Sequence, residues 1–126
     1  MGSNWALLAL RIAVGVTFIV HGVQKQAMWK MQPTEQLPAP FLRLLRFLSI
    51  IEPLGGVALL AGFLTPFAAA GLGIIMLGAI DLKGRKMHKG FTGDGGWELD
   101  FVILAANVAL VLLGAGAWSI DQVLKI

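Results

Sequence analysis

Four long apolar stretches, separated by shorter polar connections, dominate the pattern of this chain. They lie at residues 5–23, 41–63, 66–80 and 97–113. An α-helix needs about 20 apolar residues to cross the hydrocarbon of a bilayer. The pattern therefore predicts an all-α fold, a membrane-spanning four-helix bundle, with residues 1–126 forming a single integral membrane domain.

The composition agrees with a chain that lies in lipid. Hydrophobic residues make up 57% of its 126 positions and charged residues 13%, and the mean hydropathy is +0.80. A soluble domain of this size leaves about a third of its chain surface in water, so it has no room to hide so many apolar side chains. This excludes a soluble monomer, a disordered chain and a nucleic-acid binder. We expect the chain to be embedded in a lipid bilayer.

Two prolines indicate local geometry inside the predicted helices. Pro53 lies within the second stretch, where it lacks an amide proton and frees the carbonyl of Ser49, so we expect a kink there. At the start of the third stretch, Thr65 is the expected N-cap and Pro66 the expected first helical residue. The connection at residues 24–40 holds three prolines and is not expected to be one regular helix.

Basic residues are distributed unequally between the two ends of the predicted bundle. The second connection, between residues 63 and 66, carries no charge. The other two connections and their borders hold Lys25, Lys30, Arg43, Arg46, Lys83, Arg85, Lys86 and Lys89. The positive-inside rule then predicts that these loops lie in the cytoplasm and both termini outside. We expect the membrane to be a prokaryotic plasma membrane. All four tryptophans lie near span ends or in a connection, as interfacial aromatic residues do.

Three predicted spans carry a polar side chain to one depth. At a rise of about 1.5 Å per residue, Arg11 lies about 18 Å, Glu52 about 16 Å and Asn107 about 15 Å from the loop side. A lone charge at that depth costs at least about 2.5–3.5 kcal/mol. We therefore expect an interior Arg11–Glu52 ion pair, with Asn107 filling the remaining hydrogen bonds. This pair is interpreted either as a structural clamp or as the lining of a ligand or proton site.

A second polar layer is expected closer to the loops. It comprises His21, Lys25, Asp81, Glu98 and Asp100. His21 and Lys25 share a helix face, and so do Asp100 and Asn107. No second histidine stands at ligand spacing from His21, so we interpret it as a hydrogen-bonded or headgroup-facing residue and expect no metal site. The candidate ligand or proton-site residues are Arg11, His21, Lys25, Glu52, Glu98 and Asn107.

Motifs for other chemistry are missing from the sequence. The chain has no cysteine, which excludes disulfides, thiolate metal sites and iron–sulfur ligation within it. The run Gly93-Asp94-Gly95-Gly96 has no Walker lysine and follows no predicted strand, so it is interpreted as a turn. The sequence assigns no catalytic residue, and we expect no cofactor held by this chain alone.

The order of several short motifs resembles the DoxX family of small four-helix membrane proteins. The first helix contains Arg11, His21-Gly22 and Lys25, and the second contains Glu52-Pro53-Leu54-Gly55-Gly56. Gly62-Phe63-Leu64-Thr65-Pro66 forms the turn, Gly95-Gly96-Trp97-Glu98 opens the fourth helix, and residues 114–121 close it. The resemblance covers nearly the whole chain and directs attention to Arg11, His21, Lys25, Glu52 and Glu98.

The resemblance also implies a functional class. The family is named from a membrane subunit associated with thiosulfate:quinone oxidoreduction. It implies a membrane or accessory subunit of a quinone-linked redox complex, with quinone as a possible ligand and the electron carrier in a partner. The expected partners are other membrane protein subunits or further copies of the chain. Two alternatives stay open: a structural lipid-embedded subunit that stabilises a larger assembly, and a small-solute or proton carrier.

Overall fold

The protein consists of four main helices and three short helical segments. The computed structural model describes residues 2–126. The main helices are α1 (Gly2–Gln24), α2 (Ala39–Ala61), α3 (Thr65–Asp81) and α4 (Glu98–Leu113). The short segments are η1 (Lys25–Trp29), η2 (Leu82–Lys86) and α5 (Ile120–Leu124). The expected all-α class is confirmed, and the four apolar stretches coincide with the four main helices to within a few residues.

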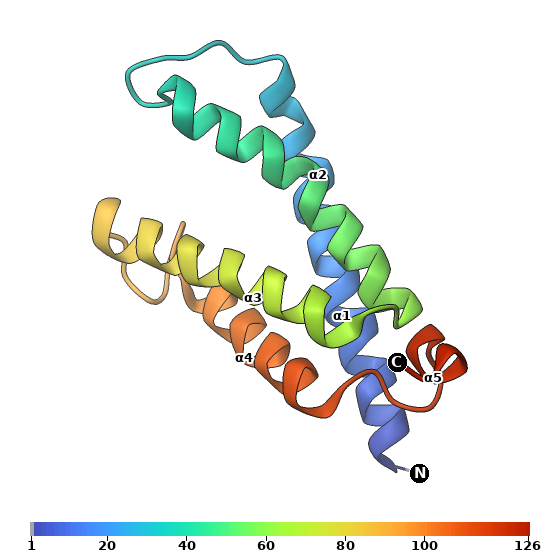
Figure 1. Ribbon diagram of the computed structural model, residues 1–126. Helices are drawn as coiled ribbons and strands as arrows, with labels where there is room; N and C mark the ends of the chain where they lie inside the picture. Colours follow the sequence, from blue (N-terminus) through green and yellow to red (C-terminus); the bar gives the residue numbers. More distant parts are fainter. Residues whose placement is uncertain (1) are drawn as a thin grey trace.

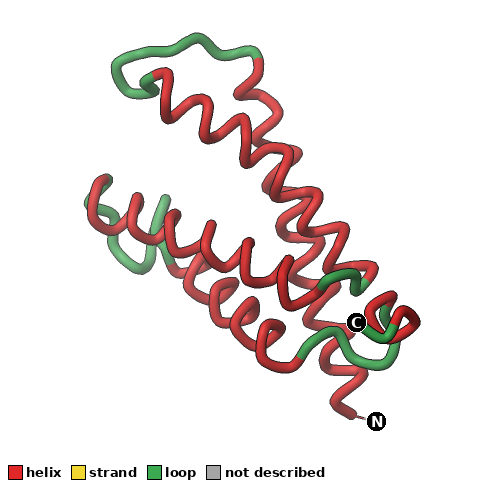
Figure 2. The backbone as a smooth tube through the Cα atoms, in the orientation of Figure 1, coloured by secondary structure: helices red, strands yellow, loops and turns green. Residues whose placement is uncertain are grey.

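Figure 1 shows the helices as two antiparallel hairpins, α1 with α2 and α3 with α4. The helices pack more closely within each hairpin than between the two hairpins. The hairpins meet near both chain termini and diverge toward the two long connections, which Figure 2 shows as loops at the same side of the view. We call the side with the termini the terminal end, and the side with the two long connections the loop end.

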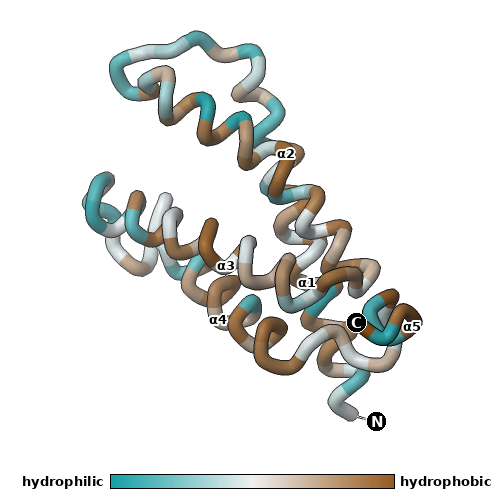
Figure 3. The backbone as a smooth tube through the Cα atoms, viewed as in Figure 1, coloured by the Kyte–Doolittle hydropathy of each residue, from teal (hydrophilic) through white to brown (hydrophobic). Residues whose placement is uncertain are grey.

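Three helical stretches are long and apolar enough to cross a membrane, and they cover Gly2–Trp29, Ala39–Ala61 and Thr65–Lys86. Helix α4 is shorter, with 16 residues. Figure 3 shows the middle of the helices as mainly hydrophobic and the two loops as mainly hydrophilic. This distribution is the one that a bilayer requires of a bundle that spans it. Two tryptophans lie at each end: Trp5 and Trp118 pack edge to face at the terminal end, and Trp29 and Trp97 lie at the loop end.

A small apolar core joins the hairpins. Its buried members come from all four main helices: Leu7, Val14, Phe18, Leu59, Ala69, Leu72, Met76, Ile103 and Leu110. Most other large apolar side chains are exposed. In a membrane protein this arrangement is expected, because lipid tails are as apolar as leucine and there is little gain from hiding a side chain from them.

Glycines bring α1 and α2 into backbone contact. A Cβ atom added to Gly15 would lie 2.7 Å from the carbonyl oxygen of Gly56, and one added to Gly56 would lie 2.6 Å from that of Gly15. Near the loop end, a Cβ atom on Gly22 would lie 2.1 Å from Cγ of Pro53. Small residues permit such close approach between helices in lipid. These contacts fix the register of α1 against α2.

The expected kink at Pro53 is confirmed. Helix α2 runs through the proline, and its axis changes direction near the middle of the helix (Figure 1). The carbonyl of Ser49, which lacks the amide proton of residue 53, instead accepts a hydrogen bond from Nε2 of Gln26 at 2.9 Å. The kink is therefore supported by a side chain from η1 rather than left with an unpaired acceptor.

We predict that the tight contact at Gly22 is required for the hairpin. Gly22→Ala should lower the free energy of unfolding by about 1–3 kcal/mol, because the new methyl group overlaps the ring of Pro53. Gly71→Ala is a matched control, since a Cβ atom there meets nothing within 4 Å. Unfolding curves in mild detergent measure both effects. An equal effect of the two substitutions would contradict the proposed register.

Candidate functional site

Buried charged groups gather in two clusters at opposite ends of the bundle. The terminal cluster consists of Arg11 and Asp121 with the backbone groups that they bind. The loop-end cluster consists of His21, Lys25, Glu52, Lys83 and Asp100. Each cluster draws its members from helices that are distant in sequence. The two clusters differ in how completely their charges are enclosed.

Arg11 does not pair with Glu52, and the expected interior ion pair is wrong. The guanidinium of Arg11 is buried and donates to three backbone carbonyls: Leu59 and Leu60, both at 3.2 Å, and Trp118 at 2.6 Å. The first two carbonyls lie in the last turn of α2, which carries the negative end of the helix dipole. Arg11 therefore acts as a cationic cap on α2 and ties the C-terminal segment to it.

Asp121 has the opposite role at the start of α3. Its carboxylate accepts hydrogen bonds from the amides of Leu64 at 2.5 Å and Thr65 at 2.8 Å, and its own amide donates to Gly62 at 2.8 Å. A carboxylate at a helix N-terminus is favoured by the dipole. The expected side-chain cap by Thr65 is wrong, because Thr65 is the first helical residue and the cap comes from a segment more than fifty residues away.

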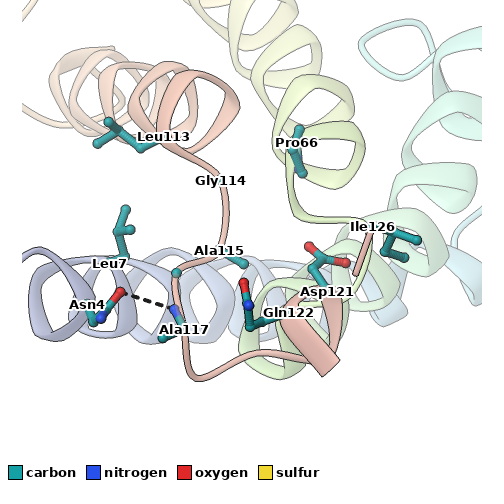
Figure 4. A pocket seen from close by; sticks show the side chains of 11 residues that line it. Asn4, Leu7, Pro66, Leu113, Gly114, Ala115, Ala117, Asp121, Gln122 and Ile126 are labelled. Atoms are coloured by element: carbon teal, nitrogen blue, oxygen red, sulfur yellow. Dashed lines mark hydrogen bonds between the residues drawn. The ribbon is translucent and has the colours of Figure 1, made fainter. Parts of the chain in front are cut away.

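Figure 4 shows how the C-terminal segment closes the terminal end. A groove of about 430 Å³ lies between Asn4, Leu7, Pro66 and residues 113–117, 121, 122 and 126. Asn4 Oδ1 accepts a hydrogen bond from the amide of Ala117 at 3.1 Å. The charges of Arg11 and Asp121 are already used in helix caps. The terminal cluster is thus a structural clasp.

Glu52 pairs with Lys25 at the loop end. The carboxylate of Glu52 is buried, and Nζ of Lys25 lies 2.9 Å from Oε2 and 3.2 Å from Oε1. The lysine side chain is 26% exposed, whereas that of Glu52 is 1% exposed. A buried carboxylate is therefore linked through one salt bridge to the surface of the bundle. The sequence predicts both residues as candidate site residues, but it does not predict that they pair.

A second ion pair crosses the other hairpin. Nζ of Lys83, in η2, lies 2.8 Å from Oδ2 of the buried Asp100 in α4, and the lysine side chain is 31% exposed. His21 of α1 is half-buried and lies within electrostatic range of both pairs, since the charges of Lys25, Glu52, Asp100 and Lys83 all act on its ring. The loop-end cluster therefore contains two buried carboxylates, two partly exposed lysines and one histidine.

The prediction that Arg11 and Glu52 lie at one depth is wrong, because α2 extends beyond the loop-side end of α1. The first turns of α2 pack against η1 instead of α1, so Glu52 lies well inside α2 but opposite the last turns of α1. Arg11 and Lys25 are separated by fourteen residues, or about 21 Å along a helix. Distance from the end of a residue's own apolar run is thus a poor measure of its level in the bundle.

The remaining candidates stay outside both clusters. Asn107 is buried, with Nδ2 donating to the carbonyl of Ile103 at 3.0 Å, and it contacts neither Arg11 nor Glu52 through a hydrogen bond. The Cβ atom of Asn107 faces Gly73 of α3, where an added Cβ atom would lie 3.5 Å from it. Glu98 is exposed at the start of α4, and Asp81 pairs with Arg85 on the surface.

Within residues 2–126, no group of three histidine or acidic side chains is arranged to hold a metal ion. The carboxylates, ammonium groups and imidazole of the loop-end cluster are capable of proton exchange, hydrogen bonding and charge stabilisation. Two members of the cluster, Lys83 and Asp100, are not among the candidate site residues predicted from the sequence. Asp100 was expected only as part of the second polar layer. Its position seven residues before Asn107 on one helix face was the available signal.

The fold and the two clusters define a small helical membrane protein with ionisable groups enclosed among its helices. The chain belongs to the DoxX family, whose model matches residues 6–89. It is also 32% identical, over 134 residues, to the uncharacterized membrane protein Rv3486 of Mycobacterium tuberculosis, with 93% of this chain and 80% of that protein covered. No solved structure matches the chain. The family match includes His21, Lys25, Glu52 and Lys83 of the loop-end cluster.

We predict that Arg11 stabilises the terminal end. Arg11→Leu removes three charge-assisted hydrogen bonds and should lower the free energy of unfolding by about 2 kcal/mol or more. Hydrogen exchange at residues 116–123 should accelerate as the C-terminal segment detaches. Lys125→Leu, at an exposed cation of the same end, should change neither quantity. Unaltered exchange in the Arg11 variant would show that another contact holds the segment.

Proposed function

We propose that this DoxX-family protein is a membrane subunit that binds a quinone headgroup at the loop-end cluster and serves a redox partner. The partner supplies the electrons. This chain supplies an apolar environment and groups that exchange protons with the quinone oxygens. The observation that carries the proposal is the pairing of Glu52 with Lys25 beside His21 and the Asp100–Lys83 pair.

The geometry supports proton exchange at this place. Ionisable groups inside a membrane are costly and are commonly retained for function. Glu52 and Asp100 are enclosed, but their lysine partners reach the surface, so each pair connects the interior with the loop side. A quinone site needs apolar walls and a few polar groups that can donate to or accept from the ring oxygens. His21 lies within electrostatic range of both pairs, so it is able to act with either of them.

The test is quinone binding by the purified protein in lipid nanodiscs. A short-chain ubiquinone should quench tryptophan fluorescence saturably, and Glu52→Gln and Asp100→Asn should each weaken binding about tenfold, since a hydrogen bond to a charged group contributes about 1.5–3 kcal/mol. Glu35→Gln is the matched control, because that glutamate is exposed in the first connection. Circular dichroism verifies that each variant is folded.

Two results would overturn the proposal. One is the absence of saturable quenching by the wild-type protein. The other is equal binding by the two cluster variants and the Glu35→Gln control. A stoichiometric protein partner that copurifies with quinone-free protein would instead support the structural-subunit alternative. Vesicle flux that Glu52→Gln abolishes, without any quinone binding, would support the carrier alternative.

We also propose that the loop end faces the cytoplasm and that both termini lie outside. The support is the concentration of lysine and arginine in the first and third connections, which the positive-inside rule places in the cytoplasm of a prokaryotic cell. A phosphatase reporter that is active only outside should be active when fused after Ile126 and inactive when inserted at residue 93. The reverse pattern would invert the orientation.

A further inference from the structure

An apolar groove lies on the lipid-facing side of the bundle, between α2 and α3. Its volume is about 450 Å³. Helix α2 lines it with Phe47, Ile51, Leu54 and Gly55, and α3 lines it with Phe67, Ala68, Gly71, Leu72, Ile74 and Ile75. Every one of these side chains is apolar. The groove belongs to neither polar cluster.

The bend at Pro53 explains why the groove exists. Gly55, just after the proline, lies against Leu72, where an added Cβ would be 2.9 Å from the leucine side chain. Toward the loop end the first half of α2 turns away from α3 (Figure 1). Phe67 is 76% exposed, and a Cβ atom on Gly71 would meet nothing within 4 Å. No side chain of the described residues fills this groove, and it is open to the surroundings of the bundle.

Arg43 lies one turn before the groove lining on α2, toward the loop end. It precedes Phe47 by four residues and Ile51 by eight, so the three share one face of α2. Its side chain is exposed and, among residues 2–126, has no ion-pair or hydrogen-bond partner. The Cα atom of Arg43 thus lies about 6 Å along the helix from that of Phe47, the first groove residue of α2.

The nearby Arg46, unlike Arg43, has partners within the chain. Its guanidinium donates to the carbonyls of Met28 at 2.9 Å and Met31 at 2.8 Å, and it stacks 5.7 Å from the ring centre of Trp29. Arg46 therefore holds the first connection in place. Arg43 lies one turn earlier on the helix, and its exposed guanidinium is accessible to a group outside the chain.

We propose that the groove and Arg43 form a binding site for an anionic phospholipid, with an acyl chain in the groove and the phosphate at Arg43. The guanidinium matches a phosphate through paired hydrogen bonds. An apolar occupant without an anionic group, such as a helix of a second copy, would leave Arg43 unpaired, and this favours the lipid. The site goes beyond the proposed quinone function and does not depend on it.

The test measures which lipids stay bound after the protein is released from nanodiscs of equimolar phosphatidylglycerol and phosphatidylcholine, by native mass spectrometry. The wild type should retain phosphatidylglycerol preferentially. Arg43→Gln should reduce that preference about fivefold, the effect expected of one cation near an anionic surface. Arg43→Lys should retain much of it. Gly71→Leu, which fills the groove, should reduce the retention of both lipids.

Arg85→Gln is the matched control, because that arginine side chain is 85% exposed on the other hairpin. Arg85→Gln should leave the preference for phosphatidylglycerol unchanged. Inorganic phosphate added to the wild type should not change that preference either. Equal retention of the two lipids by the wild type would overturn the proposal. So would an equal loss in Arg43→Gln and Arg85→Gln, unchanged retention in Gly71→Leu, or a lipid-free dimer. Circular dichroism of each variant separates these results from misfolding.

Discussion

A charge that enters a bilayer must find its partner inside the protein, and this constraint orders the structure. Arg11 donates to carbonyls at the end of α2, Glu52 pairs with Lys25, and Asp100 pairs with Lys83. Each partner lies on a different element from the charge that it satisfies. The charges therefore fasten helices together while they are shielded from lipid.

The two ends of the bundle use this constraint differently. At the terminal end, Arg11 and Asp121 complement the dipoles of α2 and α3, and both are bound to backbone atoms. Such an arrangement stabilises the fold and offers little to a ligand. At the loop end, the buried carboxylates bind lysines that are partly exposed. These lysines are open to the surroundings of the bundle, which is what a site for exchange with a ligand or with water requires.

The sequence predicts the helices well because each main helix coincides with one long apolar run. It also predicts the kink at Pro53 and the free carbonyl of Ser49, since both follow from the missing amide proton. The partners of Arg11 and Glu52 are not predictable in this way. They depend on the register that Gly22 and Pro53 impose between helices, and no single helix carries that information. In the sequence, Asp121 is only one residue of the family motif at residues 114–121, because its cap on α3 is a tertiary contact.

The pairing of Glu52 with Lys25 is tested most directly by solid-state NMR dipolar recoupling in bilayers. The protein is labelled at lysine Nζ, arginine guanidinium nitrogens and glutamate Cδ, and Glu52→Gln identifies the Glu52 signal. We expect the Glu52 carboxyl carbon to recouple with a lysine nitrogen and with no arginine nitrogen. Recoupling to the Arg11 guanidinium, with none to lysine, would show that the buried charges meet at one depth and that the pairing described here is wrong.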